Sequence, residues 1–408
     1  MTASLSVRMF KGAEGERFAV LVDEQGVPLY YPNLYSTWAL RARSLAANSI
    51  LNTLGALKAV CMWEAHSKIC LKELFSRGEM LNEVQIRDLC DFLQRSLIQP
   101  AVSRKVVPIK RRYQMVGASE HYFRLTEAAR YLKFLASHLS GAFCDDVAIQ
   151  KMVAAVKANR PTKPQKSSSD QEPNGLDEKV VDSLKEALKP GAVDNPAKDY
   201  GVQLRNVLIF LILLLTGMRR GELLNLKIGD IDFSANTISI IRRPDSKGDA
   251  RTNQPTVKTL PRKIPVCEEL MNQIRAYVMH HRNKVLGAKK HPYLFVTHKL
   301  GPFSGRPLSI PGFKKWMAML GEIVEGSGFH AHGLRHHWNY IFSTQADENG
   351  MSPEKEKKIR AYLMGWTETG NTAETYNRRH TRKAANAAVL KMQHKLFGSD
   401  VTEPTDGQ

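Results

Sequence analysis

A histidine and an arginine stand three residues apart, at His332 and Arg335, in the stretch from Phe329 to Trp338. On a helix this spacing places both side chains on one face, about one turn apart, so they can converge on one ligand. A guanidinium grips two oxygens of a phosphate, and an imidazole can donate a hydrogen bond or move a proton. The pair suits an anionic ligand, although a solvated helix face would carry the same two residues.

A second arginine, Arg219, stands at the start of a predicted helix, Met218–Leu226, directly after the Thr216-Gly217 stop of the helix before it. Backbone N–H groups at a helix start already favour anions. Further along, Trp366 follows the glycine that ends another predicted helix, and Tyr376 lies ten residues later. Each of these aromatic residues could equally fill a core.

A hairpin is predicted between these two regions. Its strands are Thr237–Arg242 and Thr256–Val266, and a long loop, Pro244–Pro255, joins them. Lys247 lies at the tip of this loop, and Lys258 lies on the return arm. Either lysine could bring a cation to the site.

His332 and His336 stand four apart and could ligate zinc, but no Glu follows the first as a metalloprotease pattern requires, and no Cys lies nearby. We therefore expect no metal and no cofactor. The five cysteines lack CxxC spacing, which is typical of free thiols in a reducing cytoplasm.

The composition points to a polyanion as partner. A chain of 408 residues predicts two domains. Its formal net charge of +19 is typical of proteins that bind nucleic acid or an anionic membrane. The longest apolar run, Val207–Leu215, is shorter than the roughly 20 residues that cross a bilayer. No signal peptide is recognisable, so we expect a cytoplasmic protein that binds DNA and no membrane.

The polar stretch Asn159–Gly175 contains three prolines and no aliphatic residue, which predicts a linker. The periodicities predict a mainly α protein with a small antiparallel β-sheet, an α+β fold. A first hairpin is expected at Arg17–Tyr31, a helix at Thr126–Ser140 and a strand at Tyr293–Thr297. The predicted segments are an N-terminal hairpin or extension (1–35), a helical DNA-binding domain (36–158), a linker (159–178), a catalytic domain (179–397) and a disordered tail (398–408).

Taken together, the motifs resemble those of the tyrosine recombinase (phage integrase) family. They appear in the family's order on a basic, two-domain chain. The resemblance covers roughly Leu204 to Tyr376, and the helical N-terminal part looks like the core-binding domain of the family. The motifs are Thr216–Leu226, Lys258–Pro265, His332–Arg335, Leu363–Trp366 and Thr372–Tyr376.

The resemblance implies catalytic roles for six residues. Arg219 and Arg335 match the two arginines that clamp the scissile phosphate, and His332 matches the histidine before the second of them. Tyr376 matches the nucleophile that joins the DNA 3′-phosphate and frees a 5′-hydroxyl. Lys258 matches the hairpin lysine that protonates the leaving oxygen, with Lys247 as the alternative. Trp366 stands where the family usually has a second histidine.

The function implied is site-specific DNA recombination without metal or ATP. We expect integration or excision of a mobile element or prophage in a bacterial nucleoid. Double-stranded DNA, a homotetramer on that DNA, and accessory DNA-bending or directionality proteins are the implied partners. The alternatives are a resolvase of replicon dimers and a catalytically idle DNA-binding accessory or regulatory protein. The helix that follows Tyr376 could pack on its own chain or on a neighbouring protomer.

Overall fold

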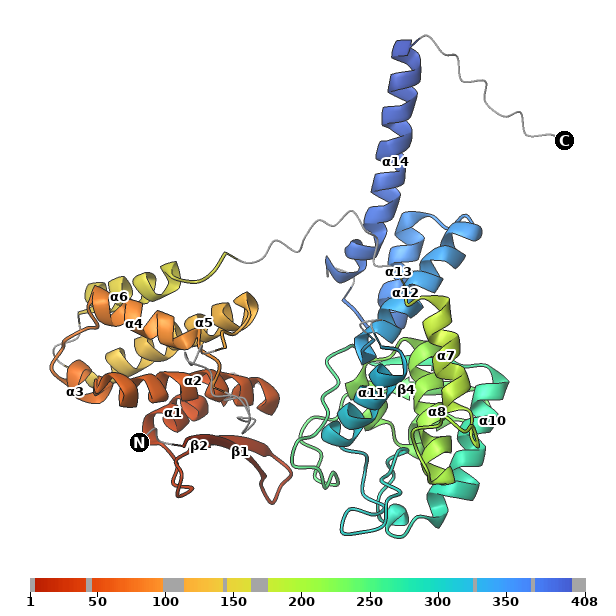
Figure 1. Cartoon of the computed structure of the whole chain (residues 1–408), viewed down its shortest axis with the longest axis horizontal. Helices are drawn as coiled ribbons and strands as arrows, with labels where there is room; N and C mark the ends of the chain where they lie inside the picture. Colours follow the sequence, from red (N-terminus) through yellow and green to blue (C-terminus); the bar gives the residue numbers. More distant parts are fainter. Residues whose placement is uncertain are drawn as a thin grey trace, which may run out of the picture. The chain divides into compact units, whose positions relative to one another are not determined.

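The computed structural model describes residues 4–41, 46–97, 114–141, 145–162, 175–325, 329–367 and 371–397. Within the last range, the side chains of residues 371–379 and of Lys383, Lys395 and Phe397 are outside this description. The chain divides into two compact units, residues 1–169 and 170–408 (Figure 1). Most of the predicted linker and the whole predicted tail lie outside the described residues.

The first unit combines a β-hairpin with helices. Strands β1 (Ser6–Lys11) and β2 (Arg17–Val22) pair antiparallel, with Ser6 opposite Val22. The helices are α1 (Tyr30–Tyr35), α2 (Ala47–Ser67), α3 (Leu71–Ser76), α4 (Glu83–Leu93), α5 (Ala118–Leu139) and α6 (Asp146–Ala158). The hairpin and the helices share one core, which contains Leu21 of β2, Leu54, Leu57 and Trp63 of α2, and Leu125 and Leu132 of α5.

Two expectations for this unit differ from the structure. The strand at Arg17–Val22 forms its ladder with the residues before it and makes the isolated bridge Val22–Pro28 with the residues after it, because α1 begins at Tyr30. Helix α5 begins at Ala118, well before the apolar periodicity that starts at Thr126. Polar residues in its first turns interrupt the apolar periodicity. One of them, Arg124, is buried and donates hydrogen bonds to the carbonyls of Leu93 (3.2 Å) and Arg95 (2.8 Å).

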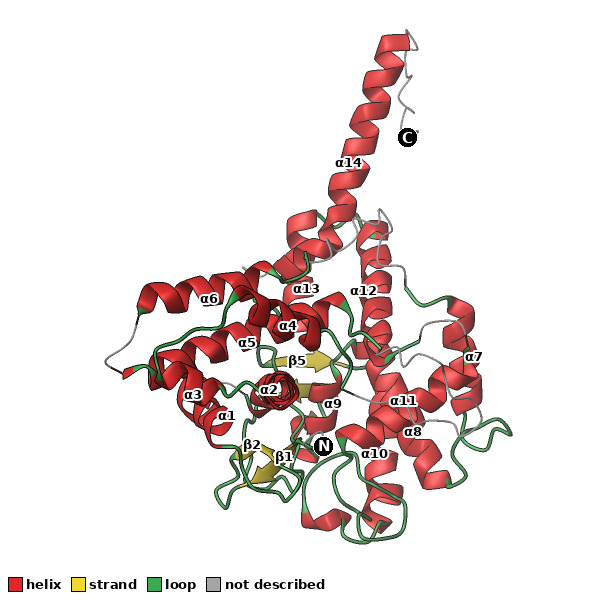
Figure 2. Cartoon of the chain, turned by 60° about the vertical axis from the view of Figure 1, so that its left-hand side comes forward, coloured by secondary structure: helices red, strands yellow, loops and turns green. Residues whose placement is uncertain are grey.

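The second unit places helices around a small sheet. Strands β3 (Ile231–Asp232), β4 (Thr237–Ile240) and β5 (Arg262–Pro265) are antiparallel in that order, with Ile238 opposite Ile264. The helices are α7 (Glu178–Leu188), α8 (Tyr200–Thr216), α9 (Arg220–Asn225), α10 (Glu268–Ala276), α11 (Ile310–Ile323), α12 (Ala331–Glu348), α13 (Pro353–Met364) and α14 (Asn371–Phe397). The predicted mainly α fold with a small antiparallel sheet is confirmed (Figure 2).

Helix α8 forms the centre of the second unit. It is apolar nearly all round, as expected of a helix enclosed by others, and its side chains from Leu208 to Leu213 are almost all buried. Helices α7, α10 and α12 contact it. The C-terminal end of α8 is therefore held firmly, and Gly217 follows it directly.

Segment Tyr293–Thr297 is not a strand, contrary to expectation. It makes only the isolated bridges Lys227–Tyr293 and Val296–Pro307 among the described residues. Its N–H and C=O groups bond to two irregular segments, for example Leu294 N–H to the carbonyl of Leu226 at 2.8 Å. The return arm predicted from Thr256 is β-structured only at Arg262–Pro265. Among the described residues, no helix combines the length and apolarity that crossing a bilayer requires.

Helix α14 is a single long helix that includes Tyr376, whereas the sequence predicted a separate helix after this residue. Figure 1 shows it extending beyond α12 and α13. Several apolar side chains of its C-terminal half are exposed, namely Val389, Leu390, Met392 and Leu396.

Candidate active site

Arg219 lies in the short connection between α8 and α9. Gly217 ends α8 with a left-handed conformation (φ 60°), which turns the chain sharply. Arg219 immediately precedes α9, and its N–H donates to Glu222 Oε2 at 2.9 Å. Its side chain is one-third exposed (33%). The guanidinium can therefore reach a ligand from solvent while its backbone is fixed.

Arg335 joins three separate parts of the sequence. Its side chain is buried on α12 and donates hydrogen bonds to the carbonyls of Gly217 (2.7 Å) and Met364 (3.1 Å). Its Cζ lies 5.4 Å from the centroid of the Trp366 ring. Arg335 thus connects its own helix α12 with the end of α8 and with the end of α13, where Trp366 follows.

His332 lies one turn before Arg335 and remains exposed to solvent. Its ring meets that of His336 edge to face, with centroids 4.5 Å apart. Partial burial and the neighbouring His336, Arg335 and Arg219 lower the pKa of His332 to about 4. The imidazole is therefore neutral at neutral pH and can donate or accept a hydrogen bond. The effect of both arginines on its pKa also indicates that all three side chains lie near one another.

Trp366 follows the left-handed Gly365 that ends α13. It is buried (9% exposed) and packs with Ala361 and Met364. The ring is thereby held by the core, and Arg335 Cζ lies over its face. This position of Trp366 is compatible with a packing role and with a role toward a ligand.

Glu222 is a buried carboxylate that bonds to several segments of this region. Arg262 Nη2 donates to its Oε2 at 2.9 Å, and Thr259 Oγ1 donates to its Oε1 at 2.5 Å. Burial alone would raise the pKa of Glu222, but the hydrogen bonds and charge of Arg262, together with the Thr259 hydroxyl and the Arg219 N–H, lower it. The carboxylate is therefore ionised and orients Arg219.

Lys258 is exposed on a segment that is fixed on both sides. Thr259 bonds to Glu222, and the N–H of the following Leu260 donates to the Gly365 carbonyl at 3.0 Å. On the other side, a Cβ on Gly221 would lie 2.2 Å from the Thr256 carbonyl oxygen, so only glycine allows this close approach. These contacts hold the Lys258 segment against the start of α9, which follows Arg219, and against the end of α13, which precedes Trp366.

Lys247 is also exposed, but it lies in another part of the hairpin loop. The neighbouring Ser246 N–H donates to Gln254 Oε1 at 3.3 Å. Arg251 anchors the same loop to the carbonyl of Leu224, near the other end of α9, at 2.9 Å. The contacts of the loop thus lead to the end of α9 that is farther from Arg219.

Tyr376 lies in the second turn of α14, and its side chain is outside the described residues. The contacts therefore bring together Arg219, the Lys258 segment, His332, Arg335 and Trp366. The position of the phenol stays a prediction.

Three residues of this region received no role from the sequence: Glu222, Thr259 and Arg262. All three stand inside the motifs, at fixed distances from Arg219 and Lys258. All three are polar or charged and yet buried. The spacing of residues in the sequence does not reveal burial, so no signal in the sequence pointed to their role.

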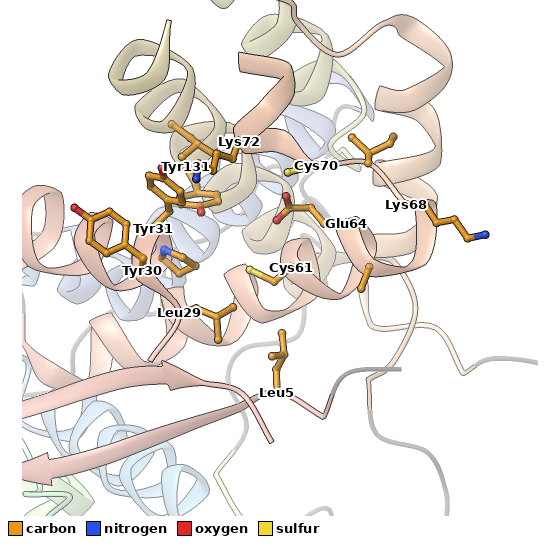
Figure 3. Close-up of a pocket in the computed structure, with 14 residues that line it drawn as sticks. Leu5, Leu29, Tyr30, Tyr31, Cys61, Glu64, Lys68, Cys70, Lys72 and Tyr131 are labelled. Atoms are coloured by element: carbon orange, nitrogen blue, oxygen red, sulfur yellow. The ribbon is translucent and has the colours of Figure 1, made fainter. Parts of the chain in front are cut away.

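The first unit contains a separate pocket of about 520 Å³ beside α1 and α2. Figure 3 shows the Glu64 carboxyl within it, where burial raises the pKa of Glu64 to about 7. The backbone N–H of Leu71 donates to this carboxyl at 3.0 Å. None of the predicted catalytic residues lines this pocket.

Comparison with known proteins matches residues 174–383, just over half of the chain, to the phage integrase family. The chain is 28% identical over 212 residues to tyrosine recombinase XerD of Halalkalibacterium halodurans, covering 50% of this chain and 63% of the relative. It is 31% identical over 135 residues to transposase A from transposon Tn554 of Staphylococcus aureus, covering 32% of this chain and 34% of the relative. The chain thus spans less than two thirds of these curated relatives.

Solved structures with similarity include a lambda integrase dimer bound to a COC′ core site. That match has a TM-score of 0.48 and 12% identity, and covers 85% of this chain and 76% of the other. XerA recombinase matches with a TM-score of 0.34 and 18% identity, covering 85% of this chain and 92% of the other.

Proposed function

Because the chain belongs to the phage integrase family, we propose that it is a site-specific tyrosine recombinase. It cuts and rejoins DNA strands through a covalent bond between Tyr376 and the 3′-phosphate. The phenol oxygen attacks phosphorus, the bond to the 5′-oxygen breaks, and that oxygen leaves as a hydroxyl. A hydroxyl from another strand reverses the step, so no external energy source is needed.

The phosphate is held by cationic and N–H donors of the chain. Attack places about two negative charges on its non-bridging oxygens, and Arg219 and Arg335 stabilise them, with His332 and the Trp366 indole as further donors. Each such donor is worth about 10²–10³-fold in rate. Because an indole cannot shuttle a proton, acid–base work falls on His332, which accepts the proton of the phenol, and on a lysine, which donates one to the leaving oxygen.

Lys258 is the lysine that protonates the leaving 5′-oxygen in this proposal. What supports this assignment over Lys247 is the double attachment of its segment, through Thr259 to Glu222 and through Leu260 to Gly365. These contacts keep Lys258 beside the two helix ends that present Arg219 and Trp366.

The observation that carries the proposal is the position of Arg335. Its bonds to the Gly217 and Met364 carbonyls connect the chain segments of Arg219 and Trp366. Burial, the neighbouring His336 and the positive charge of both arginines lower the pKa of His332, which lies one turn away. A cluster of cations and neutral donors of this kind fits a phosphodiester.

The partner is double-stranded DNA, with which a net charge of +19 is compatible. The biological role in this proposal is integration or excision of a mobile element or prophage, carried out by a homotetramer on DNA with accessory proteins. Resolution of replicon dimers is the alternative role, and an idle DNA-binding protein is the alternative without catalysis.

The test uses a duplex built from the repeats that flank the coding region, nicked near the expected cleavage point so that the reaction cannot reverse. The wild-type chain should form a covalent protein–DNA adduct, and Tyr376→Phe should form none. A chelator should leave the rate unchanged. A wild-type chain that binds this DNA without forming an adduct would be an accessory protein, and loss of activity in chelator would indicate a metal-dependent nuclease.

A further inference from the structure

Helix α14 is attached to α13 close to Tyr376. His380 follows Tyr376 by four residues, so both lie on the same side of the helix. His380 Nε2 lies 2.6 Å from Glu356 Oε2 of α13. The Glu356 side chain is fully buried, and the His380 side chain is 20% exposed. The helix that carries the tyrosine is thus bonded to the interior of its own chain, one turn beyond that tyrosine.

The contact continues inward through hydrogen bonds. The other oxygen of Glu356 pairs with the buried Arg360. Arg360 Nη1 donates to the Asn339 carbonyl at 2.9 Å and to Asn339 Oδ1 at 3.0 Å. Asn339 Nδ2 donates in turn to the Arg335 carbonyl at 2.8 Å. A continuous polar chain therefore leads from His380 on α14, through α13, to Arg335 on α12.

We propose that His380 is a positioning residue, which docks the helix of Tyr376 onto α13 of the same chain and so sets where the tyrosine lies relative to the arginines. This inference rests on the proposed function. His380 does not touch the reacting atoms; it limits where the start of α14 can lie relative to Arg335. Misplacement of a reacting group by about 1 Å can cost about 10²-fold in rate.

A metal ion is the alternative for this cluster. Asp347, Glu356 and His380 each offer one ligand atom, and these atoms lie within 4.8 Å of one another. Two ligands of a tetrahedral zinc stand about 3.3 Å apart, because the metal–ligand bonds are about 2.0 Å long. The His380–Glu356 distance of 2.6 Å is that of a hydrogen bond. Arg360 on the same carboxylate also disfavours a second cation.

The first experiment compares His380→Ala, His380→Gln and His394→Ala by the single-turnover rate of adduct formation and by affinity for the nicked duplex. His394 is a matched control, since it is exposed further along the same helix. We expect His380→Ala to lose about 10–100-fold in rate with unchanged affinity, because the tyrosine is misplaced. His380→Gln should recover part of the rate, since its amide can donate to Glu356, and His394→Ala should match the wild type.

Three results would overturn the proposal: a wild-type rate for His380→Ala, an equal loss of DNA affinity, or a wild-type rate that falls in EDTA and returns with Zn²⁺. Backbone amide exchange in residues 372–382 provides a readout that needs no cleavage. Exchange should be faster in His380→Ala than in the wild type. If the wild type forms no adduct, the proposed recombinase activity fails, and the exchange measurement still decides whether His380 docks the helix.

A mixing experiment tests whether the tyrosine acts within its own chain. Arg219→Ala and Tyr376→Phe proteins are combined on the nicked duplex. Neither chain then carries both groups, so we expect no adduct. An adduct from the mixture would mean that the tyrosine crosses to another protomer, and the proposal would be wrong.

Discussion

Glu222 and Arg262 form an ion pair of 2.9 Å in which each side chain is only 1% exposed. They are 40 residues apart, at the start of α9 and in β5. Arg262 Nε also donates to the Leu363 carbonyl at 2.6 Å. The pair therefore joins the segment of Arg219, the hairpin with Lys258 and the end of α13 at one buried point.

Breaking this pair should destabilise the chain strongly. Glu222→Gln leaves Arg262 as a buried, uncompensated charge, and we expect a loss of about 3–5 kcal/mol in the free energy of unfolding. The double variant Glu222→Gln/Arg262→Met removes that charge and should lose less than Glu222→Gln alone. Urea unfolding of the single and double variants measures this, and additive losses would show that the pair is not coupled.

Arg335→Lys should lose both stability and cleavage. A lysine ends in a single nitrogen, so it does not reproduce the two separate nitrogens that donate to the Gly217 and Met364 carbonyls, and each buried carbonyl left without a donor costs about 1–3 kcal/mol. We expect cleavage of the nicked duplex to fall by about 10²-fold or more at a temperature where the variant is still folded. Arg275→Lys, on the exposed side chain of α10, is the control. A normal cleavage rate for Arg335→Lys would remove Arg335 from the site.

Trp366→His should retain adduct formation within about tenfold, because an imidazole N–H can replace the indole N–H as a donor to the phosphate. Trp366→Phe keeps most of the packing against Met364 but has no donor, so we expect a larger loss, on the order of 10²-fold. Melting temperatures separate a packing defect from a catalytic one. Equal rates for the two variants at equal stability would assign Trp366 to packing alone.

The pH dependence of stability should reveal the environment of His332. Its pKa is about 4 in the folded chain, against 6.5 as the ordinary value. Between these values the unfolded chain binds a proton that the folded chain does not, so the free energy of unfolding falls as the pH decreases from 6.5 to 4.

His332→Asn lacks this contribution, and its stability should decline less than that of the wild type over the same interval. Urea unfolding at pH 7 and pH 4.5 provides the measurement, with the exposed His394→Asn as control. If the wild type and His332→Asn lose stability equally between pH 7 and pH 4.5, the pKa of His332 in the folded chain lies near its ordinary value.

Gly221→Ala should move the hairpin away from α9. Its Cβ would lie 2.2 Å from the Thr256 carbonyl oxygen, a distance that neither backbone can tolerate. We expect the Lys258 segment to shift, with cleavage falling by about 10²-fold while DNA affinity changes little. Gly229→Ala is the control, because a Cβ there meets nothing within 4 Å. Unchanged cleavage by Gly221→Ala would show that the close approach of α9 to Thr256 does not determine the position of Lys258.

The amino-acid sequence determined the helices with strong apolar periodicity, the central α8 and the family. It did so because these depend on local spacing and on residue type at positions in a motif. The end of α8 at Gly217 could be predicted for the same reason, because glycine adopts the left-handed conformation of a helix end without steric cost. The predicted six residues also came from local motifs, and their catalytic roles stay predictions.

Tertiary structure alone decided which polar groups are buried and what they bind. The first turns of α5 and the irregular course of Tyr293–Thr297 depend on partners outside their own segments. The same holds for Glu222 with Arg262 and for Glu356 with His380. A charged residue is ordinarily solvated, and only long-range packing that supplies a specific partner makes its burial favourable. The spacing of residues within a motif carries no record of that partner.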